Sequence, residues 1–304
     1  MRTNSISLSP INLTNDDTCR KDCTFEHTQI SLPSSSLKKD YEFISCVWRE
    51  CEGESGGGIS LSVTDDNSIT LSVTNGEFYS CTATRYEGGG IYIYGINKAT
   101  ITDSLFLTCR TEAPNDGIGG GIDLSSIQDY PLVQSSSFIS CTSGCDAGGL
   151  AFRPCPKWEH VCVVSCHFVN CEGQNTQSTD AGSYEVWDSN AAIGCSNTLF
   201  VNSHAERRGG ASTIGIDNSA RHSDSIHLFC FCFFNDNSAE FKPGNDVFFY
   251  EWKPTEPFLH CFSTTKEYRI SYYSNNDYHF DKDDWLFLFD HIMQMLLLQT
   301  NFIL

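Results

Sequence analysis

An aromatic residue followed three positions later by cysteine, or by a small polar residue, recurs along this chain about every 30 residues. Successive aromatic residues are separated by 30, 28, 32, 30, 32 and 34 positions. The seven pairs are Trp48/Cys51, Phe78/Cys81, Phe106/Cys109, Phe138/Cys141, Phe168/Cys171, Phe200/Ser203 and Phe234/Asn237. Self-similarity with a period of roughly 20 to 50 residues is typical of stacked-repeat proteins, in which one small unit packs on the next.

Two further positions keep the same register. The residue five places before each aromatic is apolar, and the residue three places before it is short and polar in six of the seven repeats. The apolar residues are Phe43, Val73, Ile101, Val133, Val163, Cys195 and Phe229. The second set is Ser45, Asn75, Asp103, Ser135, Ser165 and Asn197, with Phe231 as the exception. Short polar side chains of this kind favour turns.

A glycine cluster follows each cysteine position, as Gly88-Gly89-Gly90 does in the second repeat. Four clusters lead directly into an alternating segment: ISLS from Ile59, IYIY from Ile91, IDLS from Ile122 and LAFR from Leu150. Alternation with a period of two predicts a strand. Glycine before it permits a sharp backbone corner that other residues adopt only at a cost.

The repeats therefore predict an all-β protein. No segment before the C-terminal tail shows a convincing 3.6-residue apolar stripe, which argues against helical repeats and βαβ units. We expect a right-handed parallel β-helix (a β-solenoid) of about seven coils, because parallel crossover connections are normally right-handed. The predicted organisation is an N-terminal cap at 1–40, β-helix repeats at 41–262 and a C-terminal cap or tail at 263–304.

The repeat pattern resembles that of the polymorphic outer-membrane protein family and of the large β-helix surface proteins of parasitic protists such as trichomonads. The matching segments are FYSCTATRYEGGGIYI at 78–93, FISCTSGCDAGGLAF at 138–152 and FNDNSAEFKPGNDVFF at 234–249. The resemblance covers roughly residues 41 to 262. It implies an adhesin or variable surface protein, located at the cell surface or secreted. Its partner would be a glycan or an extracellular protein.

Charge and motifs narrow the function further. Asp and Glu outnumber Lys and Arg by 38 to 19, which gives a net charge of −19. This charge makes binding to nucleic acid electrostatically unfavourable. The glycine triplets do not complete GxGxxG, and no glycine precedes a lysine as a phosphate-binding loop requires. We therefore expect neither a nucleic-acid partner nor a small-molecule cofactor.

The chain has 16 cysteines, a count that raises disulfides and metal sites as explanations. Five of them share one repeat position, where a β-helix would stack equivalent residues about 4.8 Å apart inside the core. Because cysteine behaves as a small, easily buried hydrophobe, we interpret this set as a cysteine ladder of free thiols. Scattered disulfides or a metal remain as alternatives.

The two best metal candidates are Cys19/Cys23/His27 and the cluster of Cys155, His160, Cys162, Cys166 and His167. Neither has the spacing of common zinc modules, so we predict no metal site.

A binding strip is predicted on the strand after the glycines. If Ile59, Ile91, Ile122 and Leu150 point inward, the alternate residues point outward. The predicted ligand-binding residues on this strip are Tyr92, Tyr94, Asp123, Arg153, Glu185 and Trp187. Aromatic faces pack on sugar surfaces and charged groups exchange hydrogen bonds, so the strip suits a glycan. The other interpretation of these residues is an ordinary exposed strand surface.

Two functions follow from this arrangement. The first is a surface-type structural or adhesive module without catalytic residues, and the alternative is a polysaccharide-cleaving β-helix glycosidase or lyase. Asp123 and Glu185 would stand two coils apart, about 9.6 Å by strand spacing. That is near the roughly 6.5–9.5 Å that separates the carboxylates of inverting glycosidases. We prefer the first, because these acids are isolated and shared fold does not imply shared function.

The two ends give weaker signals. The first twenty residues contain no apolar run of signal-peptide length, and the apolar last twenty are interrupted by polar residues such as Asp290 and Gln294. A membrane is therefore expected as a partner only through an anchor missing from this sequence. The tail at 285–304 is open to three interpretations: a cap on the last coil, an anchor, or a non-native end.

Overall fold

The computed structural model of the chain describes most of the repeat region and little of either end. The described residues are 11–12, 19–32, 40–63, 69–114, 116–129, 131–153, 160–174, 181–187, 192–215, 227–240, 245–250, 258–259, 261–263, 270–274 and 277–281. These residues form strands, turns and bends and contain no helix.

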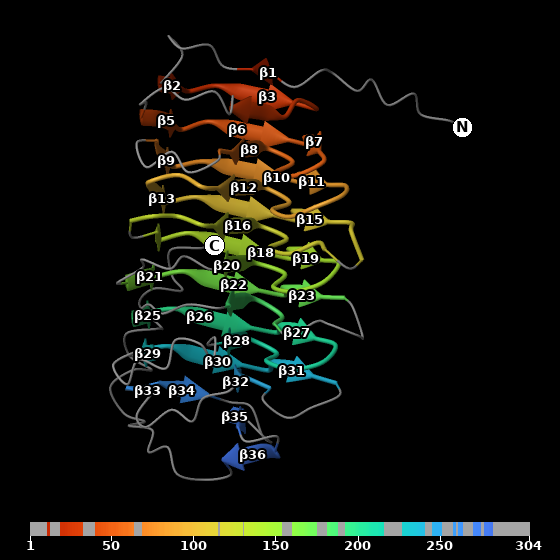
Figure 1. Cartoon of the computed structure of the whole chain (residues 1–304), viewed down its shortest axis with the longest axis vertical. Helices are drawn as coiled ribbons and strands as arrows, with labels where there is room; N and C mark the ends of the chain where they lie inside the picture. Colours follow the sequence, from red (N-terminus) through yellow and green to blue (C-terminus); the bar gives the residue numbers. More distant parts are fainter. Residues whose placement is uncertain are drawn as a thin grey trace, which may run out of the picture.

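Four sheets, named A to D, run along a single stack, and the chain passes through them in the repeating order B, C, D, A (Figure 1). Sheet B contains β2 (Cys19–Lys21), β5 (Asp40–Ile44), β9 (Thr70–Thr74), β13 (Lys98–Thr102), β17 (Leu132–Gln134), β21 (His160–Val164), β25 (Ala192–Ser196), β29 (His227–Cys230) and β33 (Phe258–Leu259). Sheet C contains β3 (Thr24–Glu26), β6 (Val47–Arg49), β10 (Glu77–Tyr79), β14 (Leu105–Leu107), β18 (Ser137–Ile139), β22 (His167–Val169), β26 (Leu199–Val201), β30 (Phe233–Asn235) and β34 (Phe262–Ser263).

The remaining two sheets complete each coil. Sheet D contains β7 (Glu52–Gly53), β11 (Thr82–Ala83), β15 (Arg110–Thr111), β19 (Thr142–Ser143), β23 (Glu172–Gly173), β27 (His204–Ala205) and β31 (Ser238–Ala239). Sheet A contains β1 (Ile11–Asn12), β4 (Ile30–Leu32), β8 (Ile59–Ser62), β12 (Ile91–Tyr94), β16 (Ile122–Ser125), β20 (Leu150–Arg153), β24 (Tyr184–Val186), β28 (Ser212–Gly215), β32 (Val247–Tyr250), β35 (Ile270–Ser274) and β36 (Asp277–Asp281).

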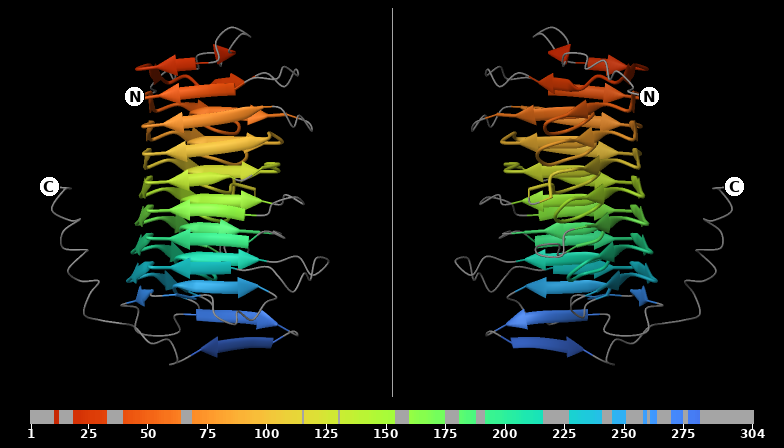
Figure 2. Two further views of the ribbon diagram at one scale, coloured as in Figure 1. Left: turned by 90° about the vertical axis from the view of Figure 1, so that its left-hand side faces the viewer. Right: turned by 90° about the vertical axis from the view of Figure 1, so that its right-hand side faces the viewer.

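The stacking is parallel along the described part of the chain, and the rows of strands are visible from both sides in Figure 2. Only the last pair, β35 with β36, is antiparallel among the described strands. The predicted fold class, an all-β parallel β-helix, is confirmed. The number of coils differs from the prediction of about seven, because sheet C contains nine described strands.

The additional strands lie at the two ends of the predicted repeat. Strands β2, β3 and β4 pair in parallel with β5, β6 and β8, so residues 19–32 form a coil ahead of the expected start at residue 41. At the other end β35 continues sheet A beyond residue 262. The first coil carries a weaker sequence signal, because Thr28 follows Phe25 at the position where later coils have cysteine. The apolar tail at 285–304 lies outside the described residues.

The repeated aromatic residues form one continuous stack of rings through the core. Neighbouring ring centroids are 4.3 to 5.3 Å apart, and the ring planes differ by 2° to 22°. The stack runs through Phe25, Trp48, Phe78, Phe106, Phe138, Phe168, Phe200 and Phe234. Parallel, in-register pairing such as Phe78 with Phe106 places each ring directly on the next. The period of the aromatic residues thus reflects the length of one coil.

The short polar residues before each aromatic form the corner between sheets B and C. All of them adopt the left-handed conformation, with φ between 49° and 55°, and Phe231 does so too. A second set two residues after the aromatic, including Ser80 and Asn202, has the same conformation at the next corner. Asn, Asp and Ser tolerate this region better than bulky residues do, which explains the sequence pattern.

The glycine clusters allow the coils to approach closely between sheets D and A. The first glycine of a triplet, as at Gly119, has a positive φ of 64°. A Cβ on the second, Gly120, would lie 2.2 Å from the Thr142 carbonyl oxygen and 2.3 Å from that of Gly148. Only a residue without a side chain fits at Gly120.

The repeated cysteines lie inside the stack. Cys51, Cys81, Cys109, Cys141 and Cys171 are buried and form no disulfide. Each thiol contacts the backbone of the preceding coil, where Cys109 Sγ donates to the Phe78 carbonyl oxygen at 3.5 Å and Cys141 Sγ to that of Phe106 at 3.4 Å. Asn237, at the same repeat position, donates from Nδ2 to the Phe200 carbonyl oxygen at 3.2 Å. The position therefore favours a small hydrogen-bond donor as well as a small volume.

Candidate functional site

The predicted binding strip lies on the outer face of sheet A. Tyr92, Asp123, Ala151 and Glu185 are direct partners in four successive strands. Tyr94, Ser125 and Arg153 form the neighbouring column. Because Ile91, Ile122 and Leu150 fill the core, their alternation partners face outward, as the sequence predicted.

The expected exposure of this strip is wrong for its two acids. The Asp123 side chain is fully buried and Glu185 is 4% exposed, whereas Tyr94 is 39% exposed. Tyr92, Arg153 and Trp187 are half-buried. Ala151, which lies between the two acids on the sheet, packs in a cluster with Ala147, Ala181 and Ile118, and these three belong to the segments ahead of the glycine turns. Alternation predicts which way a side chain points but not what lies over it.

Three of the predicted residues contribute to one polar cluster. Arg153 lies between two carboxylates, with its Nε 3.5 Å from Asp123 Oδ2 and its Nη1 3.3 Å from Glu87 Oε1. Ser125 donates a hydrogen bond to Asp123 Oδ1 at 2.5 Å. Tyr92 interacts electrostatically with the charges of Asp123, Glu87 and Arg153. The cluster therefore joins residues of three successive coils.

Glu87 was not among the predicted site residues. It stands one place before Gly88, whose φ of 69° begins the glycine turn. That turn places the carboxylate beside Arg153, which comes 66 positions later in the chain. In the sequence, the one feature that could have pointed to Glu87 is that it directly precedes a glycine triplet. That feature becomes informative only once the geometry of the turn is known.

Burial controls the ionisation of the cluster. It raises the pKa of Asp123 to about 7, although the positive charge of Arg153 and the hydrogen bond from Ser125 act in the opposite direction. Burial also raises the pKa of Tyr92, and the nearby Asp123 and Glu87 charges add to that effect. For Arg153, burial lowers the pKa, but the surrounding carboxylates outweigh it and the net shift is upward. Near neutral pH the cluster can exchange one proton, at Asp123.

Two of the remaining predicted residues, Glu185 and Trp187, lie further along the stack. Glu185 is two strands from Asp123, with Ala151 between them. The Trp187 indole lies over Gly215, because a Cβ at Gly215 would be 2.5 Å from Trp187 Cε3. The indole therefore lies along the sheet instead of projecting from it. The part of the strip that a ligand can reach is centred on Tyr94, Tyr92, Arg153 and Glu87.

No family model, curated protein or solved structure gave a significant match to this chain. Within the described ranges, no group of three or more His, Cys, Asp and Glu residues is arranged to hold a metal ion. In the same part of the chain no helix is long and apolar enough to cross a membrane. Both metal-candidate clusters from the sequence include side chains outside that part, namely those of Cys19, Cys155 and His160.

Proposed function

We propose that this protein is a non-catalytic β-helix module with a structural or adhesive role at the cell surface or in the secreted space. Its ligand would be a glycan or an extracellular protein. One observation carries the proposal: the outer face of sheet A presents an exposed tyrosine, Tyr94, beside a half-buried tyrosine and an arginine–glutamate pair. Aromatic faces next to charged hydrogen-bonding groups are what sugar and peptide ligands require.

The buried acid of the strip supports this site without contacting a ligand. Asp123 lies beneath Arg153 and holds the guanidinium from the protein side. Glu87 holds the same guanidinium from a second direction, and its side chain is 17% exposed. A fixed arginine loses less rotamer entropy on binding than a mobile one does, so this support favours ligand affinity.

The surface location rests on the resemblance of the repeats to bacterial and protist surface proteins. The buried cysteine ladder fits a structural role in the same proposal. Its thiols donate to carbonyl groups of the preceding coil, as Cys171 does to Phe138 at 3.4 Å. We propose that these cysteines act as packing and hydrogen-bonding residues, and that none is a catalytic nucleophile.

The test is binding to an array of glycans and extracellular-matrix proteins. Tyr94→Ala, alone and combined with Tyr92→Ala, should reduce retention on the array at least several-fold, because aromatic contact area is lost. The control is Ser60→Ala with Ser62→Ala, since Ser60 and Ser62 are the partners of Tyr92 and Tyr94 on the adjacent strand. Tyr94 is exposed, so Tyr94→Ala should leave the melting temperature nearly unchanged. Equal retention of all variants would contradict the proposal.

A polysaccharide-cleaving enzyme is the second candidate. The observation that favours it is the raised pKa of Asp123, about 7, which suits a general acid. Against it, both Asp123 and Glu185 are covered, so a sugar chain has no direct access to either carboxylate. Cleavage of a polysaccharide panel that Asp123→Asn or Glu185→Gln abolishes would establish the enzyme instead of the binding module.

A further inference from the structure

A second set of cysteines lies at the corner between sheets B and C, two residues before the aromatic position. Other coils have Gly76, Ser104, Ser136 or Thr198 there. Each corner thiol donates to a backbone carbonyl oxygen of the preceding coil, as Cys166 Sγ does to Val133 at 3.5 Å and Cys232 Sγ to Cys195 at 3.3 Å. The accepting residue is the one five places before the aromatic of that preceding coil. The corner position therefore brings its side chain next to a residue of the core.

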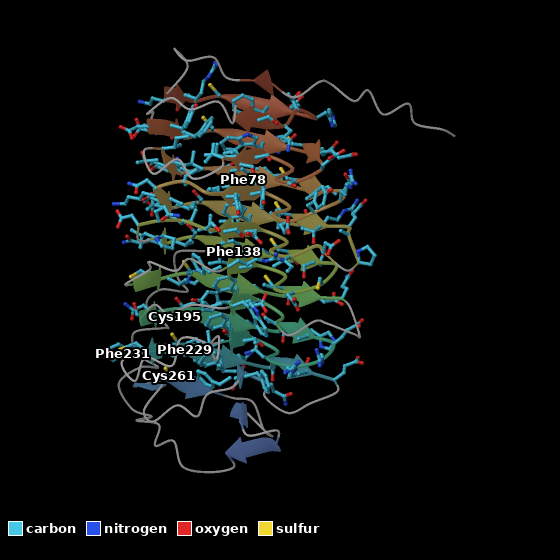
Figure 3. The ribbon with its side chains drawn as sticks, in the orientation of Figure 1. Phe78, Phe138, Cys195, Phe229, Phe231 and Cys261 are labelled. Carbon is cyan, nitrogen blue, oxygen red and sulfur yellow. The ribbon has the colours of Figure 1, made fainter. Side chains whose placement is uncertain are left out.

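One of these corners brings two thiols together. Six of the seven residues five places before the aromatics are Phe, Val or Ile, and the seventh is Cys195. Cys195 lies on the side of the stack where sheet B runs (Figure 3). Cys232 Sγ is 3.8 Å from Cys195 Sγ. Both residues are free thiols in the structure and are buried, with 1% of Cys195 and 2% of Cys232 exposed.

The geometry of this pair differs from that of the cysteine ladder. Ladder cysteines such as Cys109 and Cys141 occupy equivalent positions of adjacent coils, so one strand spacing, about 4.8 Å, separates their Cβ atoms. A disulfide requires Cβ atoms roughly 3.5–4.5 Å apart. Cys195 pairs in register with Phe229 instead, and Cys232 follows three residues later, beyond the corner. The corner turns the Cys232 side chain towards Cys195, and an approach of about 1.8 Å would bring the two sulfur atoms to bonding distance.

The burial of the pair determines when such a bond can form. Exchange between thiols and disulfides requires a thiolate and access to the sulfur atoms. In the folded stack burial raises the pKa of Cys232, and neither sulfur is open to solvent. The bond therefore forms before the coil of Cys232 packs on the coil of Cys195. Once formed, it is protected from reductants by the same burial.

We propose that Cys195 and Cys232 form a disulfide that joins two adjacent coils, with a low-molecular-weight disulfide as the oxidant. One protein thiolate attacks the oxidant, which gives a mixed disulfide and releases one small thiol. The second protein thiolate then displaces the other small thiol and completes the bond. The two cysteines together lose two protons and two electrons, and the oxidant is reduced to two thiols.

The disulfide cross-links the C-terminal part of the stack. It closes a loop between residues 37 positions apart, which restricts the unfolded chain. The two coils that it joins have Ser203 and Asn237 at the ladder position instead of cysteine. Secreted proteins fold in the presence of such oxidants, so the disulfide agrees with the proposed location. It does not depend on the binding strip, because neither cysteine belongs to sheet A.

The experiment refolds the full-length protein with and without a mixture of oxidised and reduced glutathione. Free thiols are then alkylated in denaturant, and the peptides are analysed by mass spectrometry without reduction. With the oxidant, most molecules should contain the peptide pair linked through Cys195 and Cys232, whereas Cys166 should be alkylated. The melting temperature of the oxidised protein should exceed that of the protein refolded without oxidant by roughly 5–10 °C.

Two variants keep the test independent of misfolding, because each introduces a residue that other coils have at the same position. Cys195→Val copies Val133 and Val163, and Cys232→Ser copies Ser104 and Ser136. Each should remove the oxidant-dependent shift in melting temperature. The matched control is Cys166→Ser, at the equivalent corner beside Val133, and it should keep the full shift.

Three results would overturn the proposal. The first is alkylation of both Cys195 and Cys232 after refolding with the oxidant. The second is a link from Cys232 to Cys261, the corner cysteine of the next coil, whose thiol donates to the Phe229 carbonyl oxygen at 3.3 Å. The third is a full shift in melting temperature in Cys195→Val. Retention of Cys195→Val on the glycan and matrix array tests the ligand site separately and should equal that of the parent.

Discussion

At the scale of single residues, the left-handed corners explain why short polar residues recur. Six of the seven residues three places before the aromatics are Ser, Asn or Asp, and the seventh is Phe231. Phe231 has a φ of 53° and is 53% exposed, at the left edge of the stack in Figure 3. A bulky residue in this conformation is strained and gains little from burial.

Replacing Phe231 by asparagine should therefore stabilise the protein. We expect the free energy of unfolding to rise by about 1 kcal/mol, because asparagine adopts the left-handed region at lower cost. Urea denaturation of the parent and the variant measures this change. The reverse substitution Asn197→Phe, at the equivalent corner, should destabilise by a similar amount, and a stabilising result there would refute the explanation.

The Asp123 carboxyl predicts a pH dependence. Its pKa is about 7 in the folded protein, above the value of about 3.9 in an unfolded chain, so the protonated form favours folding. The protein is therefore most stable, as far as this group is concerned, below pH 4, and stability is lost as the pH rises towards 7. Between pH 5 and pH 7 the free energy of unfolding of the parent should fall by about 2 kcal/mol, and that of Asp123→Asn should not show this fall. Urea denaturation of both proteins at the two pH values checks it, and parallel pH curves would contradict it.

At the scale of the elements, the glycine turn sets the distance between coils. Gly120→Ala should destabilise the protein by at least about 3 kcal/mol, because the new methyl group would meet two backbone oxygens that cannot move aside. Gly76→Ser is the control, since other coils have Ser104 or Ser136 at that position and the nearest atom belongs to the Val73 side chain. Thermal unfolding compares the stabilities of the two variants. An equal loss of stability in both would contradict this explanation.

The strands and their register were predicted from the sequence alone, whereas parts of the first coil and of the candidate site were not. The aromatic period, the apolar residue five places earlier and the glycine triplets predicted the strands and their register, because each position has the same neighbours in every coil. The coil at residues 19–32 was missed, since Phe25 is followed at the third position by Thr28 instead of cysteine. The burial of Asp123 and the position of Glu87 beside Arg153 were also missed. Glu87 belongs to a segment before the glycine turn whose length differs between coils, so no period describes its position.

The buried thiols give a prediction that belongs to the elements as well. If the ladder cysteines are free, few thiols should react in the native protein, and most should react after denaturation without a reductant. Burial raises the pKa of Cys166 to about 12, which further lowers its reactivity in the folded state. Counting thiols with a thiol reagent before and after denaturation measures this. Most of the 16 cysteines being oxidised in pairs would contradict the ladder interpretation.

At the scale of the whole molecule, the solenoid is a one-dimensional stack. Each strand of sheet C pairs only with the strands before and after it, as β18 does with β14 and β22. The stability of such a protein is approximately the sum of terms for single coils and for the interfaces between neighbours. The position of a defect along the stack should therefore determine how much of the molecule it affects.

Removing one ring from the stack tests this property. Phe138 lies in the middle, with rings 4.9 Å and 4.7 Å away on its two sides, whereas Phe25 ends the described stack with one neighbour at 5.3 Å. Phe138→Ala should cost about 3–5 kcal/mol and divide unfolding into two steps, because the two halves of the solenoid lose their coupling. Phe25→Ala should cost less and release only the first coil. Hydrogen exchange along the sheets during urea denaturation separates these outcomes. If both variants unfolded in a single cooperative transition and lost the same free energy of unfolding, the molecule would unfold as one unit.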